Sequence, residues 1–350
     1  MRLNTRLNLI PIAALALGCL VAMPSVRAQS AAEFFKGKQI KLVIGYPAGS
    51  GYDVHARLLG RHMGRHIPGD PTIIAQNMLG AGSIRAANFV YNVAPKDGLT
   101  IGAINRSVPL APLLGTTEKE QTQFDPLNYG WVGSMNSTIS IGIVWAASGI
   151  TKFNELLTRE VIVAAAAPAS DSFVFANILN NIVGTKLKIV SGYQGSTENY
   201  LALERGEATG YMGTSYSSLK TTKPDWIRDH KVNILVQVSL ARDPALPDVP
   251  LVMDFAKTEA QRQALELILA PQQMGRPYMT TPDVAPERLQ ALQSAFMATM
   301  KDPSFVEEAT KQTIDIDPMD GPAVLTLLQK LFRSPPAVVK AAQDALRVPQ

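Results

Sequence analysis

The residues best suited to chemistry lie between Ile40 and Asp53, in the sequence IKLVIGYPAGSGYD. An apolar, β-branched run leads into a turn of small residues at Gly49, Ser50 and Gly51, and apolar positions at helical spacing follow. Asp53 stands where a helix N-cap is expected. A strand, a small-residue turn and a capped helix bring free backbone N–H groups to one point, and such a point binds phosphate or carboxylate.

The glycine pattern argues against a phosphate. A dinucleotide-binding turn needs G-x-G-x-x-G, but Val54 occupies the position of the third glycine, and the lysine of a P-loop does not follow. A tight turn between a strand and a helix, with no ligand at all, is the alternative on spacing alone.

No catalytic or metal-binding set stands out in the sequence. No G-x-S-x-G occurs, and four histidines in the whole chain give little support to a Ser-His-Asp triad. His62 and His66 stand four residues apart on an expected helix and could bind a metal, but no glutamate and no evident third ligand follow them. A polar helix face is the plainer interpretation, and we expect no catalytic residue, no metal and no cofactor.

The first 28 residues have the features of a secretory signal peptide. Arg2 and Arg6 precede an apolar stretch over residues 7–23, and residues 26–28 resemble an A-x-A cleavage site. We therefore expect a periplasmic protein that begins near Gln29. Cys19, the only cysteine, lies within this segment, and lipidation there is an alternative that would add only a tether.

The charge of the chain points to no nucleic acid and no membrane surface. The signal segment carries three arginines and no acidic residue. The rest of the chain therefore contains 30 of the 33 Lys and Arg and all 29 Asp and Glu, and its charges nearly balance. No basic tract occurs, and no later apolar run reaches the ~18 residues of a membrane helix. Without cysteines, the remaining chain must depend on its core for stability, and its length suggests two domains.

Strand-like and helix-like patterns alternate along the chain, which predicts an α/β protein with sites at the carboxyl ends of its strands. We expect strands at 72–75, 100–104, 129–132, 139–145, 161–165, 187–190, 208–212 and 232–238, and a further strand at 276–280. Helices are expected at 83–92, 108–114, 152–157, 172–183 and 197–204, and mostly helix follows residue 259.

An ordered set of motifs resembles the Bug/TctC family of extracytoplasmic solute receptors, the binding components of tripartite tricarboxylate transporters. The motifs are YPAGSGYD at 46–53, GAGS at 80–83, PKDGLT at 95–100, YQG at 193–195, RGEA at 205–208, the proline-initiated helix at 286–292 and the DP turn at 302–303. The resemblance implies a type II periplasmic-binding-protein fold: two α/β lobes, a hinge and a ligand cleft between them. It places lobe 1 at 31–132 plus 244–350 and lobe 2 at 133–243, with prolines 244, 247 and 250 on the return crossing.

The resemblance also implies the function. We expect a monomeric receptor, not an enzyme, that captures a small organic carboxylate and passes it to a membrane transporter. Two alternatives stay open. The protein could dock a membrane sensor instead of a transporter, or it could be a secreted hydrolase or lyase, for which converging histidines and carboxylates would be needed.

The binding residues are carried over from the resemblance. In lobe 1 they are Pro47, Ala48, Gly49 and Ser50 of the first loop, Asp53 as its helix cap, and Asn105 and Arg106 after the third strand. In lobe 2 they are Ser170, Asp171 and Ser172 of a strand-to-helix turn, with Tyr193 and Thr214 after two later strands.

Two of these positions carry a chemical argument of their own. The planar guanidinium of Arg106 suits a carboxylate, although a surface ion pair is the common role of an arginine. Tyr52 departs from the family pattern, and its phenol could narrow the cleft or stack on a ring of the ligand. The identity of the carboxylate has no signature in the sequence, because backbone N–H groups would hold it.

Overall fold

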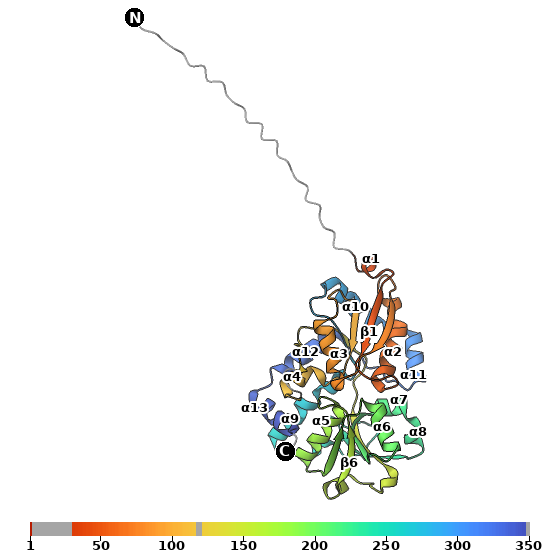
Figure 1. Cartoon of the computed structure of the whole chain (residues 1–350), viewed down its shortest axis with the longest axis vertical. Helices are drawn as coiled ribbons and strands as arrows, with labels where there is room; N and C mark the ends of the chain where they lie inside the picture. The colour runs from red at the N-terminus through yellow and green to blue at the C-terminus, as the bar shows by residue number, and fades with distance from the viewer. Residues whose placement is uncertain (2–29, 117–120, 348–350) are drawn as a thin grey trace.

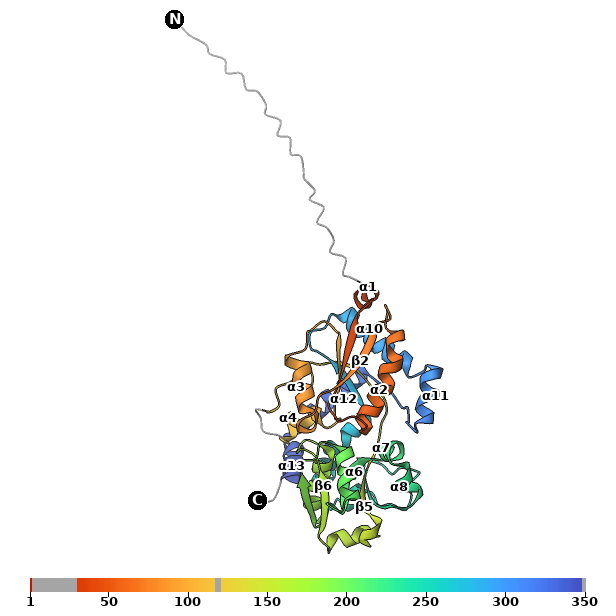
Figure 2. The same ribbon diagram turned by 45° about the vertical axis from the view of Figure 1, so that its right-hand side comes forward.

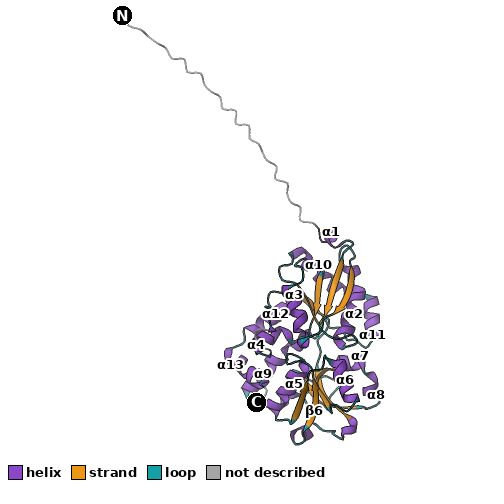
Figure 3. Cartoon of the chain, viewed as in Figure 1, coloured by secondary structure: helices purple, strands orange, loops and turns teal. Residues whose placement is uncertain are grey.

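The computed structural model describes Met1, residues 30–116 and residues 121–347 (Figure 1). Residues 2–28 of the predicted signal peptide, including Cys19, lie outside this described part. Two sheets lie one beyond the other along the long axis of the molecule, and helices flank both (Figure 3). We call the unit built on the first sheet lobe 1 and the unit built on the second lobe 2. The two-lobed α/β architecture is as predicted.

The sheet of lobe 1 has six strands in the order β11-β4-β10-β3-β1-β2. The strands β1, β2 and β3 are parallel, and β10 runs antiparallel between β3 and β4. Their bounds are β1 Gln39–Ile44, β2 Thr72–Asn77, β3 Thr100–Ala103, β4 Gly130–Ser134, β10 Pro277–Thr280 and β11 Met319–Asp320.

Helices cover both faces of this sheet. One apolar cluster joins α2, α10 and α11 to residues such as Leu42 and Ile101, while α3 and α12 pack on the other face beside Val43 and Trp131. The helices of lobe 1 are α1 Ala31–Phe35, α2 Gly51–Met63, α3 Ile84–Asn92, α4 Ala111–Leu114, α10 Pro286–Thr299, α11 Pro303–Lys311 and α12 Gly321–Phe332, with 3₁₀ turns at Gly64–His66, Ala81–Ser83 and Val108–Leu110.

The sheet of lobe 2 has five strands in the order β7-β6-β8-β5-β9. The strands are β5 Ser140–Trp145, β6 Val161–Ala165, β7 Leu187–Ser191, β8 Gly210–Ser215 and β9 Val232–Val238. Its helices are α5 Asp171–Ile178, which continues as a π turn over Leu179–Val183, α6 Ser196–Glu204, α7 Tyr216–Thr222 and α8 Pro224–Arg228, with 3₁₀ turns at Ala146–Ser148, Phe153–Leu157 and Val252–Phe255.

Two chain segments run side by side where the polypeptide passes between the lobes. The N–H of Met135 donates to the carbonyl of Arg276 at 3.1 Å, that of Gly275 to Asn136 at 2.7 Å, and that of Thr138 to Gln272 at 3.1 Å. We call residues 135–138 and 272–276 the crossing pair. Pro250 precedes the second crossing and lies beside β9, where its carbonyl accepts from Gln237. The lobe boundaries drawn from the sequence stay a prediction.

A helical pair covers one side of both lobes. The helices α9 Glu259–Leu269 and α13 Pro336–Leu346 pack on each other, and a 3₁₀ turn at Ala270–Met274 follows α9 (Figures 1 and 2). The helix α13 also contacts α4 of lobe 1 and α5 of lobe 2. Among the described residues, no helix has both the length and the apolar character to cross a bilayer.

The structure corrects several local predictions. Ser50, not Asp53, is the N-cap of α2, because the Ser50 Oγ accepts the N–H of Asp53 at 3.4 Å. The segment at 153–157 is a 3₁₀ helix. The short strand β11 was not predicted, because no strand pattern marks it in the sequence. The strand predicted at 208–212 is β8, which begins two residues later, at Gly210, and ends at Ser215.

Candidate functional site

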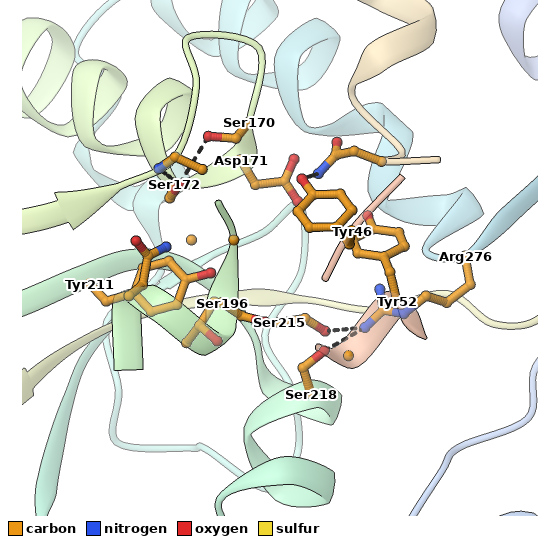
Figure 4. A pocket seen from close by; sticks show the side chains of 17 residues that line it. Tyr46, Tyr52, Ser170, Asp171, Ser172, Ser196, Tyr211, Ser215, Ser218 and Arg276 are labelled. Atoms are coloured by element: carbon orange, nitrogen blue, oxygen red, sulfur yellow. Dashed lines mark hydrogen bonds between the residues drawn. The ribbon is translucent and has the colours of Figure 1, made fainter. Parts of the chain in front are cut away.

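A small cavity of about 40 Å³ lies between the lobes, at the carboxyl ends of β1 and β3 and beside the turns that follow β6 and β8 (Figure 4). This volume holds only a few water-sized groups. Lobe 1 and the second crossing segment contribute Tyr46, Gly51, Tyr52, Asn105 and Arg276, and lobe 2 contributes Ala166, Ser170, Asp171, Ser172, Gly195, Ser196, Asn199, Tyr211, Gly213, Thr214, Ser215 and Ser218.

The first loop of lobe 1 is held by its own hydrogen bonds. The Asp53 carboxylate accepts the N–H of Gly49 at 2.9 Å and pairs with Arg57 at 2.9 Å, while the N–H of Ser50 donates to Pro47 at 3.1 Å. The cavity lining does not include the predicted loop residues Pro47, Ala48, Gly49, Ser50 and Asp53. Their part is to fix the start of α2, which carries Gly51 and Tyr52 to the cavity wall.

Two stacked phenols form the lobe 1 wall. The rings of Tyr46 and Tyr52 lie 4.7 Å apart and nearly parallel, at 12°. The Tyr46 oxygen accepts from the Asn105 amide at 3.0 Å, and the Tyr52 oxygen accepts from the backbone N–H of Arg106 at 3.1 Å. Burial, as the first cause, raises the pKa of both phenols, so both are neutral at pH 7. Tyr52 thus lines the cavity while it stacks on Tyr46.

Arg106 and Asp171 form a buried ion pair between the lobes. The Arg106 Nη2 lies 2.8 Å from an Asp171 carboxylate oxygen and donates to Ser140 at 2.5 Å. The Ser107 hydroxyl donates to the other oxygen of the Asp171 carboxylate at 2.5 Å. Arg106 is 1% exposed and lies behind the lining residues, with its charge paired to Asp171 through Nη2, while its Nε and Nη1 have no hydrogen-bond partner.

Arg276 is a second buried guanidinium, and it does line the cavity. It is 2% exposed and lies against the Tyr52 ring, with 4.6 Å from its central carbon to the ring centroid. Its Nη2 donates to Ser218 at 2.7 Å and to Ser215 at 3.2 Å (Figure 4). Its Nε has no hydrogen-bond partner, and among the described residues no carboxylate pairs with it. Burial lowers the pKa of Arg276, but a guanidinium stays protonated at neutral pH.

Hydroxyl and amide groups dominate the lobe 2 wall. The Ser172 hydroxyl accepts the N–H of Ala166 at 2.9 Å and lies 2.9 Å from the Ser170 hydroxyl. The Thr214 hydroxyl lies 2.7 Å from that of Tyr200. The side-chain amide of Asn199 is buried and has no hydrogen-bond partner among the described residues, so it is free to serve a ligand as both donor and acceptor.

The structure brings together some of the residues expected from the sequence and leaves others apart. Asn105, Ser170, Asp171, Ser172 and Thr214 line the cavity. The Tyr193 side chain instead donates to Glu207 at 3.3 Å near the surface. Sequence reasoning missed Arg276, Ser218, Asn199 and Tyr211. Arg276 had one signal, a cation at the start of the expected strand at 276–280, but nothing in the chain indicates that this strand enters the sheet beside the cleft.

The histidine pair, with His62 on α2 and His66 at the end of the 3₁₀ turn that follows it, lies elsewhere. The Nε2 atoms of His62 and His66 lie 2.6 Å from Glu308 and 2.7 Å from Asp302, both carboxylates of the α11 region. Across residues 30–116 and 121–347, no group of three or more His, Cys, Asp or Glu is suited to a metal. The pair therefore belongs to the contact that α2 and the 3₁₀ turn after it make with α11.

Known proteins share this fold. The structure of the periplasmic binding protein BugD superposes with a TM-score of 0.68 at 18% identity, over 87% of this chain and 95% of BugD. MatC from Rhodopseudomonas palustris, a structure with bound malate, gives 0.67 at 18% identity, over 89% of this chain and 99% of MatC. These likenesses confirm the type II periplasmic-binding-protein architecture with two lobes.

Sequence comparison gives the family. A Cupriavidus necator protein described as "UPF0065 protein in gbd 5'region" is 27% identical over 322 residues, which cover 88% of this chain and 87% of that protein. Residues 56–342 match the pattern of the tripartite tricarboxylate transporter family receptor, TctC, which is a family of binding proteins. The match covers most of the chain, and the chain belongs to the TctC receptor family.

Proposed function

We propose that this protein is a periplasmic receptor that captures a small organic carboxylate between its lobes and delivers it to a tripartite tricarboxylate-type membrane transporter. The observation that carries the proposal is Arg276, a buried cation at the cavity wall without a carboxylate partner among the described residues. A buried unpaired charge is costly, so an anion that pairs with it is strongly favoured. The malate of MatC supports an organic acid as that anion.

Binding follows from the groups around the cavity. The guanidinium of Arg276 offers its free Nε–H to a carboxylate, and the Ser218 hydroxyl lies beside it. The Asn199 amide supplies neutral hydrogen bonds at the lobe 2 wall. Because both lobes contribute, the ligand makes its full set of contacts only in the closed state, and closure is what a membrane partner can detect.

The test is a titration of refolded protein with organic acids, in which binding is measured by thermal shift and by calorimetry. An acid present at 100 times its Kd should stabilise the folded state by about 2.7 kcal/mol. Arg276→Gln should lower the affinity for this acid at least tenfold. The control Arg159→Gln removes an ion pair with Glu155 at the surface and should leave the affinity within twofold of the wild type. Unchanged affinity in folded Arg276→Gln would refute the assignment of Arg276.

Delivery is tested in cells. Deletion of the gene should abolish uptake of the identified acid, and the wild-type gene but not Arg276→Gln should restore it. Uptake that persists after deletion, together with loss of a transcriptional response to the acid, would instead indicate a receptor that docks a membrane sensor.

A further inference from the structure

The charge of the cavity specifies the ligand more narrowly than "carboxylate". Four aspartate and arginine side chains are buried in the described part of the chain around the cleft: Asp53, Arg106, Asp171 and Arg276. Asp53 is paired with Arg57 away from the cavity, and Arg106 is paired with Asp171. Arg276 remains, so the closed site holds one uncompensated positive charge.

No neighbouring group changes this balance. Desolvation, as the first cause, raises the pKa of the phenols of Tyr46, Tyr52, Tyr211 and Tyr278, so all four are neutral at pH 7 and none supplies a negative charge. His55 lies near Arg276, and its Nδ1 contacts the carbonyl of Gly51 at 2.6 Å. Burial, and then the charge of Arg276, lowers the pKa of His55 well below its usual range, so the imidazole is neutral too.

Asp171 makes a second anionic charge unfavourable. Its carboxylate lines the same cavity and is already satisfied by Arg106 and Ser107. A ligand with one carboxylate would neutralise Arg276 and leave the closed site with no net charge. A ligand with two would bring an unpaired carboxylate into a low-dielectric space beside Asp171, where like charges repel strongly.

We propose that this receptor selects monocarboxylates over dicarboxylates, with Arg276 as the attracting charge and Asp171 as the residue that rejects the second carboxylate. The inference rests on the proposed function and deepens it. The rest of the wall consists of hydroxyl, amide and phenol groups, and the free amide of Asn199 suits a hydroxyl on the ligand. The small cavity further favours a short chain.

The test compares pairs of acids in which a carboxylate replaces one methyl group: 3-hydroxybutyrate with malate, butyrate with succinate, and hexanoate with adipate. Calorimetry at pH 7.5 on refolded wild-type protein should give the monocarboxylate at least tenfold the affinity of its partner in each pair that binds. The ratio within a pair is the readout, because general effects on folding or closure cancel in it.

Variants test the separate roles of the two charged side chains, Asp171 and Arg276. Asp171→Asn should shift the ratio at least tenfold toward the dicarboxylate, even if loss of the contact with Arg106 weakens both acids. Arg276→Lys should keep the preference at lower affinity, and Arg276→Gln should weaken both acids of a pair at least tenfold while Asp171 still disfavours the dicarboxylate. The control Asp302→Asn removes a carboxylate at the start of α11 and should leave the ratio unchanged.

The outcomes separate the two proposals. A dicarboxylate that binds the wild type as tightly as its partner, or an Asp171→Asn ratio equal to that of the wild type, would overturn the selection and leave the carboxylate receptor intact. Failure of all six acids to bind folded wild-type protein would overturn both.

Discussion

Two carboxylates connect the α11 region to α2 and to the 3₁₀ turn that follows α2, and both are held in the charged form. A hydrogen bond from His62, followed by one from Arg61, lowers the pKa of Glu308. Hydrogen bonds from Ser304, as the first cause, and from His66 lower the pKa of Asp302. A carboxylate whose pKa is lower in the folded state contributes stability above its unfolded pKa of about 4, and this contribution is lost as pH falls through the folded value.

This contact should be visible in acid unfolding. The wild-type Tm should decrease as the pH is lowered from about 5 to 3. Glu308→Gln should have a Tm about 1–3 °C lower at pH 7 and a shallower decrease toward acid. The control Glu307→Gln removes an exposed pair with Lys311 and should change both quantities less. Circular dichroism melts across this pH range provide the measurement, and parallel curves for all three proteins would contradict the assignment.

At the scale of the element, the N-terminus of α2 sets how closely the lobes can approach. A Cβ placed on Gly51 would lie 2.0 Å from the Ser218 Oγ and 2.8 Å from its Cβ, so a glycine is required here by contact with α7 of lobe 2. The same contact brings Ser218 within reach of Arg276. The closed state therefore depends on a missing side chain.

Gly51→Ala should oppose closure. We expect ligand affinity to decrease at least tenfold, because the added methyl group separates α2 from α7, while the lobes themselves remain folded. Small-angle scattering should show less compaction on addition of ligand. The control Gly60→Ala lies in the same helix, where its Cβ would meet the Leu42 side chain at 3.3 Å and the Ile73 side chain at 3.5 Å, both within lobe 1, and it should bind ligand within twofold of the wild type.

Local patterns predicted elements well where burial and turn chemistry agree. The strands β6 and β9 have the bounds expected from their β-branched runs, and the YPAGSGYD turn leads into α2 as expected. The N-cap was misplaced because Ser50 and Asp53 are both good capping residues, and only the structure shows that Asp53 instead accepts the N–H of Gly49.

The site was less predictable because it joins distant parts of the chain. Asp171 was expected to serve the ligand, yet its carboxylate pairs with Arg106, which was expected to do the same. Arg276 reaches the cleft because β10 inserts antiparallel between β3 and β4. Strand order of this kind depends on long-range packing, which local periodicity does not encode.

At the scale of the whole molecule, α13 connects the lobes on the side of α9. The Asn181 amide of lobe 2 donates to the carbonyls of Ala345 and Arg347, each at 2.8 Å. The Gln343 amide of α13 donates to Leu113 of lobe 1 at 3.0 Å. The two lobes are thus restrained by the crossing pair and by a helix distant from it in sequence.

Removal of these side-chain contacts should loosen the pair of lobes. A double variant, Asn181→Ala with Gln343→Ala, loses hydrogen bonds worth about 0.5–1.5 kcal/mol each when buried and less when exposed. We expect the free energy of unfolding to decrease by about 1–2 kcal/mol. The ligand-free radius of gyration should increase while the ligand-bound value stays the same. Equal ligand-free values in the two proteins would show that α13 does not restrain the lobes.

The position of Arg276 on the crossing pair has a consequence for the order of events in capture. Its N–H donates to Ser134 and its carbonyl accepts from Met135, and we expect this hydrogen-bonded segment to move least when the lobes separate. We therefore expect an open receptor to keep this cation beside Tyr52 and to lose its bonds to Ser215 and Ser218 of lobe 2. An arriving anion should meet this fixed charge first, at an association rate that falls as ionic strength rises. In a second step, hydrogen bonds from the lobe 2 serines should replace the water around the bound anion.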